Sequence, residues 1–116
     1  MFNMKKLLPD CYWPSSRNGA YVSHESICVL NITQETAHIQ LTLYFEDRDP
    51  MKGFYVSVEP ERTRHIRMDK LVAEDGSTVP QDTPYAALIE CNVDVAVQYT
   101  RVDTTQSELA LMTTMV

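Results

Sequence analysis

Glycine is scarce in this sequence, and its scarcity excludes several kinds of nucleotide site. The 116 residues include three glycines, Gly19, Gly53 and Gly76, which lie too far apart to form a glycine-rich phosphate-binding loop. The P-loop and GxGxxG patterns are absent, and so are the GxSxG and HExxH motifs of hydrolases and metalloproteases. The sequence therefore predicts no cofactor and no catalytic residues, and we expect a protein that is not an enzyme.

Basic residues are also few. Lysine and arginine number 10 against 16 acidic residues, which gives a net charge of -6. Nucleic-acid binding and docking on an anionic membrane both need a basic surface, so no nucleic-acid partner is expected. No apolar run approaches the length of a membrane span, which is about 20 residues. Pro9 follows soon after Lys5-Lys6, so no apolar region of a signal peptide is expected there. We therefore expect a cytoplasmic protein without membrane insertion.

Cysteine and histidine are sparse and widely spaced. The three cysteines, Cys11, Cys28 and Cys91, form no CxxC pair. Cys28 and Cys91 lie within apolar runs, so reduced and buried thiols are expected, with a shared metal site or a reactive thiol as the alternative. The histidines do not have the short spacing of zinc motifs, so no metal ligands are assigned, although distant strands could still bring ligands together.

Alternation of apolar and polar residues with period two runs through most of the chain, and it is clearest in Thr36–Phe45. Seven or eight short strands without βαβ alternation predict one domain over residues 1–116, an all-β antiparallel sandwich of jelly-roll type. Gln106–Met115 is expected to be the last strand, with a helix as the alternative. Other expected strands are Ser26–Ile32, Phe54–Val58, Arg62–Met68, Tyr85–Cys91 and Asp94–Asp103, with short candidates at Cys11–Trp13, Tyr21–Val22 and Thr78–Val79.

The strand DVAVQYTRVD, Asp94–Asp103, carries polar groups along an extended backbone. Such a strand can hold a recognition surface in fixed positions. Successive side chains point to opposite faces, so Tyr99 and Arg101 share one face while Gln98 lies on the other. If Arg101 lines a ligand site, Gln98 is expected to support the core or a subunit contact.

Ser23-His24-Glu25 stands directly before the buried strand Ser26–Ile32. A histidine beside a glutamate suits metal binding, acid–base chemistry or a clamp for a ligand hydroxyl. Neighbours on a strand point to opposite faces, however, so His24 and Glu25 would not easily share one ligand. A solvated strand entry is the alternative.

Trp13 and the basic strand around Arg64 complete the candidates. Trp13 is the only tryptophan, and its ring can stack on a sugar or cover the core. Arg62, Arg64 and Arg67 form the one cationic cluster of the sequence. They suit an anion, a neighbouring subunit or a solvated face.

Five segments in order resemble the sensory rhodopsin transducer family: SHESICVLN, AHIQLTLYFEDRDP, RTRHIRMDKL, VPQDTPYAALIECN and VAVQYTRVD. The resemblance runs from about Trp13 to near the C-terminus. It implies a small cytoplasmic β-sandwich that assembles as a homotetramer and binds sugars or sugar-like small molecules. One family member is a soluble partner of a photoreceptor. This chain has Tyr99 where the family often has histidine, a difference that bears on specificity.

The family's polar positions fall on Trp13, Ser23, His24, Glu25, Asn31, Arg64, His65, Gln98, Thr100, Arg101 and Asp103. Residues and resemblance together favour a non-enzymatic module for a small molecule, with carbohydrate as the ligand class. One alternative is a soluble signalling adaptor for the cytoplasmic side of a sensory rhodopsin or another membrane receptor. Another is a metal-binding protein or enzyme that uses His24, Glu25 and His65. The expected ligand-binding residues are Trp13, His24, Glu25, Arg64, Gln98 and Arg101.

Overall fold

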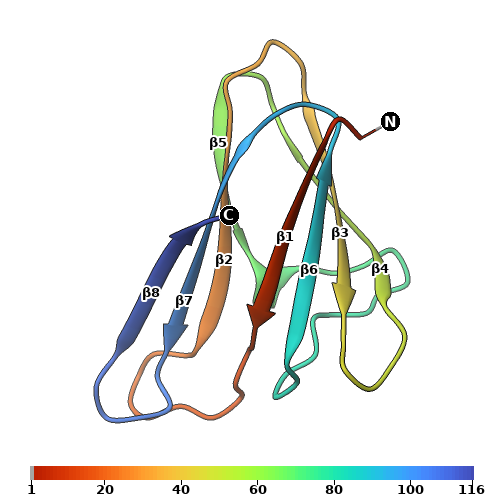
Figure 1. Cartoon of the computed structure of the whole chain (residues 1–116). Coiled ribbons are helices and arrows are strands. Elements are labelled where there is room, and N and C mark those ends of the chain that lie inside the picture. Colours follow the sequence, from red (N-terminus) through yellow and green to blue (C-terminus); the bar gives the residue numbers. More distant parts are fainter. Residues whose placement is uncertain (1) are drawn as a thin grey trace.

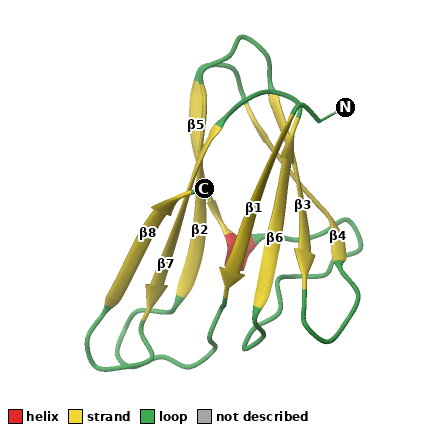
Figure 2. Cartoon of the chain, viewed as in Figure 1, coloured by secondary structure: helices red, strands yellow, loops and turns green. Residues whose placement is uncertain are grey.

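The structure is a computed structural model that describes residues 2–116, and its strands form two four-stranded antiparallel sheets (Figure 1). One sheet has the order β1-β6-β3-β4 and the other β5-β2-β7-β8. Figure 2 shows that nearly all of the rest is loop. The elements are β1 (Met4–Cys11), β2 (His24–Asn31), β3 (Ala37–Tyr44), β4 (Met51–Val58), β5 (Arg62–Arg67), the 3-10 turn η1 (Met68–Lys70), β6 (Tyr85–Cys91), β7 (Ala96–Asp103) and β8 (Ala110–Met115). The expected all-β antiparallel sandwich is confirmed.

The core lies between the two sheets and follows the alternation read from the sequence. In β3, Ile39 and Leu41 face inward and are buried, whereas His38 between Ala37 and Ile39 is exposed. In the other sheet, Ile27 and Val29 of β2 likewise face inward and are buried. Burial of each such side chain stabilises the fold by about 1.5–3 kcal/mol, which fixes the register of both sheets because a one-residue slip would reverse the faces.

Most expected strands are confirmed, with boundaries that shift by a few residues. β2 is an internal strand, as its apolar run predicted, but it begins at His24 and so contains both His24 and Glu25. The C-terminal segment forms β8, a strand rather than a helix. The segment Thr78–Val79 contributes only a bridge between Thr78 and Val72.

The beginning of the chain was predicted wrongly. Cys11 ends β1, Tyr12 and Trp13 lie beyond it, and Tyr21–Val22 is loop. β1 itself escaped prediction because Pro9 and two lysines obscure its alternation. An edge strand tolerates both features, since one side of its backbone needs no ladder partner.

Candidate functional site

A buried carboxylate, Glu25, links the two sheets at one end of the sandwich. Glu25 faces inward near the start of β2 and is 1% exposed. The Tyr85 hydroxyl, from the other sheet, donates to Glu25 Oε1 at 2.6 Å. Glu25 Oε2 accepts from the Tyr12 backbone N–H at 2.8 Å and from the Tyr99 hydroxyl. The carboxylate is thus surrounded by donors, which is how a charged group is retained in a core.

Arg101 lies directly opposite Glu25 in the β2–β7 pairing and points to the same face. Arg101 Nε donates to the Tyr99 hydroxyl at 3.1 Å, and Nη2 donates to the Asp10 carbonyl at 3.1 Å. Nη2 also lies 3.9 Å from Glu25 Oε2 and 3.7 Å from Asp10 Oδ1. Among residues 2–116, no hydrogen bond occupies Nη1 of this side chain, which is 23% exposed. Two guanidinium nitrogens, Nε and Nη2, are therefore hydrogen-bonded within the protein, and Nη1 has no hydrogen-bond partner among the described residues.

The acidic groups around Glu25 are held in their neutral forms. Burial, and next the nearby charge of Glu25, raise the pKa of Cys11 to about 12. Burial and Glu25 also raise the pKa values of Tyr85 and Tyr99 well above the ordinary range of a phenol. Both tyrosines are therefore hydrogen-bond donors at neutral pH, and the Cys11 thiol is not an activated nucleophile.

The described part of the chain matches one family throughout. The sequence profile of the Anabaena sensory rhodopsin transducer family matches residues 3–116. The chain belongs to this family. A solved structure described as Thermotoga maritima 1070 superposes with a TM-score of 0.83 at 38% identity, over 96% of this chain and 90% of that one. A solved Anabaena sensory rhodopsin transducer superposes with a TM-score of 0.76 at 34% identity, over 89% and 90%. No curated protein matches.

In this transducer-family domain, the predicted ligand residues separate into groups. Glu25 and Arg101 come together in the buried network. Trp13 follows Tyr12 and packs half-buried against the core, while its carbonyl accepts from the Asp82 N–H at 2.9 Å. His24 points to the opposite face from Glu25, and its Nδ1 lies 3.2 Å from the Val22 carbonyl oxygen. The expected division of His24 and Glu25 between two faces is confirmed.

Gln98 and Arg64 lie away from the carboxylate. Gln98 is on the outer face of β7, paired with Cys28 and Met115, whereas Arg101 faces inward. Arg64 is exposed on the edge strand β5, and its Nη1 donates to the Ser57 carbonyl at 2.7 Å. This bond occupies a backbone acceptor of β4, which is an edge strand of its sheet. Within residues 2–116, no three His, Cys, Asp or Glu side chains cluster in a way that could hold a metal ion.

Tyr85, Tyr12 and Cys11 belong to the network around Glu25 but were not predicted as parts of it. The alternation of β6 places Tyr85 on the inner face, and this was the one available signal. Its contact with Glu25 spans 60 positions and joins two sheets, so no local pattern reveals it.

Within the described chain, no helix is long and apolar enough to cross a membrane.

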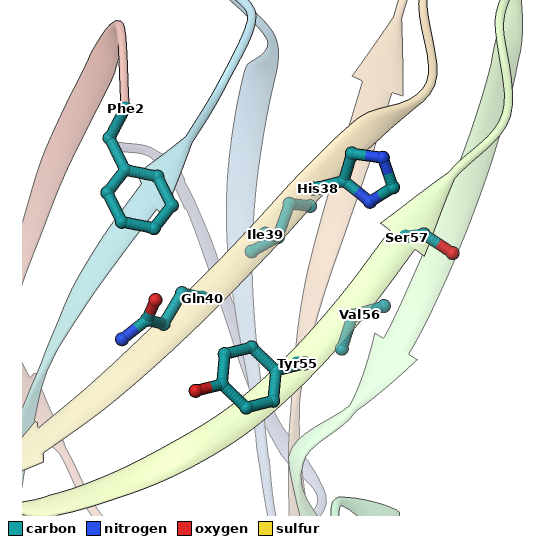
Figure 3. Close-up of a pocket in the computed structure, with 7 residues that line it drawn as sticks. All are labelled: Phe2, His38, Ile39, Gln40, Tyr55, Val56 and Ser57. Carbon is teal, nitrogen blue, oxygen red and sulfur yellow. The ribbon is translucent and has the colours of Figure 1, made fainter.

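A separate hollow of about 490 Å³ lies on the outer face of β3 and β4, in the other sheet from Arg101 (Figure 3). None of the predicted ligand residues lines it. The side chains and backbone that do are those of Phe2, His38, Ile39, Gln40, Tyr55, Val56 and Ser57. The hollow is therefore separate from the network around the buried carboxylate.

Proposed function

We propose that this transducer-family domain is a non-enzymatic binding module for a small molecule of the carbohydrate class, with Arg101 as the contact group. The observation that carries the proposal is the fixed guanidinium with its open Nη1. The Asp10 carboxylate next to it is 88% exposed, so a charged donor and a charged acceptor stand side by side. Adjacent hydroxyls of a sugar exchange hydrogen bonds with such a pair.

Rigidity supports this assignment. Arg101 is held by the Tyr99 hydroxyl and the Asp10 carbonyl, and the Glu25 carboxylate stabilises its charge. A ligand would not need to order this side chain, so less of the interaction energy is lost on binding. Glu25 then acts as a positioning residue, because its oxygens are already occupied by Tyr85, Tyr99 and Tyr12. Trp13, His24, Arg64 and Gln98 remain proposals as ligand contacts.

Thermal unfolding across a panel of neutral sugars and sugar acids tests the proposal, because a ligand that binds only the folded state raises Tm. We expect a concentration-dependent increase with at least one compound. Arg101→Gln should abolish that increase, and Asp10→Asn should reduce it. Arg62→Gln, on the exposed edge of β5, is the matched control and should retain it. A folded wild-type protein that responds to no compound would contradict the proposal.

A signalling adaptor is the second candidate, and the outer face of the β5-β2-β7-β8 sheet favours it. Leu30, Leu111 and Met115 are exposed by 46%, 65% and 65% on strands of this sheet. Their register partners place all three on its outer face. An apolar surface of this kind suits a protein partner. We propose the cytoplasmic side of a membrane receptor as that partner, in keeping with a cytoplasmic location.

Photo-crosslinking from position 30 in intact cells tests the adaptor role. The expected product is a cross-link to one integral membrane protein, and it should be lost on introduction of Leu111→Lys. A crosslinker at Leu7, exposed on the other sheet, is the control. Cross-links only to further copies of this chain would argue against a receptor.

Self-association is proposed as well, with a homotetramer as the assembly and β8 as a contact strand. All six residues of β8 are exposed, and ALMTTM contains neither charge nor proline. The other edge strands are protected: β1 carries Pro9 and two lysines, β5 carries arginines, and Arg64 covers a carbonyl of β4. An edge without these protections is suited to pairing with a second chain.

A further inference from the structure

The outer face of the β1-β6-β3-β4 sheet carries a row of polar and aromatic groups across its strands. Tyr55 of β4 pairs with Gln40 of β3, and Gln40 pairs with Glu90 of β6. Lys5 of β1 pairs with Glu90 and completes the row. Directly opposed residues on antiparallel strands project to the same side, so these groups share one surface.

The hollow on the outer face of β3 and β4 occupies the β3–β4 end of this row. Figure 3 shows the rings of Phe2 and Tyr55 on either side of the Gln40 amide, with His38 and Ser57 farther along the two strands. Phe2 is 43% exposed and Tyr55 is 54% exposed. Single exposed aromatics are ordinary on a protein surface, but here two rings and an amide border the same concavity.

The lining has a distinct chemistry. It contains two aromatic rings, two aliphatic side chains, an amide, an imidazole and two hydroxyls, one of them the Tyr55 phenol, and no Lys, Arg, Asp or Glu. The aromatic faces suit an apolar ring face, and the polar side chains suit groups that both donate and accept hydrogen bonds. An ionic ligand would find no opposite charge within the hollow itself. These features together fit a neutral ring that bears hydroxyls.

We propose that this hollow is a second ligand site, which binds the pyranose ring of a neutral carbohydrate. The C–H face of the sugar stacks on Tyr55 and contacts Phe2. The Gln40 amide, the Ser57 hydroxyl and the His38 imidazole exchange hydrogen bonds with its hydroxyls. The site belongs to the sheet that lacks Arg101, so it operates independently of the contact proposed for that residue.

Backbone amide spectra of the 15N-labelled protein test the site directly. The titrants are maltotriose, cellotriose and chitotriose, each raised to millimolar concentration. At least one should shift the amides around Gln40 and Tyr55 in a saturable way. Tyr55→Ala should weaken this binding by at least about tenfold, which corresponds to 1.4 kcal/mol. Gln40→Ala should weaken it as well.

Tyr44→Ala is the matched control, because Tyr44 is a tyrosine on β3 that is 43% exposed but lies outside the hollow. It should leave binding unchanged. Shifts that survive in Tyr55→Ala, or that are lost equally in Tyr44→Ala, would overturn the site. The absence of shifts in β3 and β4 with all three sugars would overturn it too. Arg101→Gln should not affect this titration, so the two sites can fail separately.

Discussion

Tyr85 and Glu25 join the two sheets through a single hydrogen bond of 2.6 Å between the phenol and the carboxylate. Tyr85 is on β6 of one sheet, and Glu25 is on β2 of the other. The phenol stays protonated because burial and the carboxylate raise its pKa. The interior of this end of the sandwich is therefore organised around a negative charge rather than around apolar packing alone.

Replacing Glu25 should destabilise the fold strongly. Glu25→Ala removes the acceptor of the Tyr85 and Tyr99 hydroxyls and the Tyr12 N–H, and leaves these donors unpaired in a buried place. We expect a loss of about 3–5 kcal/mol in the free energy of unfolding, measured by urea denaturation. Glu46→Ala, at an exposed position, should change it by less than about 0.5 kcal/mol. Equal effects of the two substitutions would refute the role of the network.

Alkaline pH should destabilise the protein through Cys11. Burial raises the pKa of the Cys11 thiol to about 12 in the folded protein, against an ordinary value of 9.0. As the pH rises, the thiol therefore loses its proton in the unfolded chain at a lower pH than in the folded protein. The contribution of the neutral Cys11 thiol to the free energy of unfolding is complete below pH 9.0 and declines as the pH rises towards about 12. The decline is about 1.4 kcal/mol per pH unit for one proton. Tyr85 and Tyr99 act in the same direction above their ordinary pKa of about 10.

Urea denaturation at several pH values between 8 and 11 is the measurement for this effect. Cys11→Ala should flatten the decline between about pH 9 and 10, even if it lowers stability at pH 8. Cys28→Ala removes a half-buried thiol outside the network and should retain the wild-type slope. An unchanged slope in Cys11→Ala would show that the buried thiol does not contribute.

Asn31 should tolerate no acidic replacement. Its Nδ2 donates to the carbonyls of Glu35, Val58 and Glu59 at 2.8, 3.1 and 3.2 Å, and the side chain is fully buried. Asn31→Asp replaces this donor with an oxygen that faces three acceptors, so we expect a loss of about 2–4 kcal/mol in thermal or urea unfolding. Asn18→Asp, on an exposed loop, should be nearly neutral. A small loss in the free energy of unfolding for Asn31→Asp would show that these three hydrogen bonds do not stabilise the fold.

A charge on β8 should disrupt self-association. Leu111 is 65% exposed on an edge strand without charge, and a lysine there would oppose pairing with a second chain. Light scattering coupled to size-exclusion chromatography should give a tetramer for the wild type and smaller species for Leu111→Lys. Leu7→Lys, at a residue 69% exposed on β1, should remain tetrameric. A wild-type monomer at micromolar concentration would refute the assembly.

Much of the fold could be predicted because alternation is a local signal. Val97 and Tyr99 fall on the buried face of β7 by period two alone, and so does the separation of Gln98 from Arg101. β1 was missed because an edge strand does not need a clean pattern. The candidate site was predicted only in part: Glu25 and Arg101 are paired, but Tyr85 comes from a sheet whose relation to β2 is set by tertiary packing.

The strand order also governs how this chain folds during synthesis. β1 pairs with β6, so the partner of Met4 is Cys91, and β2 lies between β5 and β7. The first strand leaves the ribosome long before the strand that binds it, and closing such distant contacts slows folding. Glu25 consequently remains in water until Tyr85 and Tyr99 have been made. β1 must therefore persist without a partner strand until β6 has emerged, and the carboxylate can be enclosed only after Tyr99 has been made.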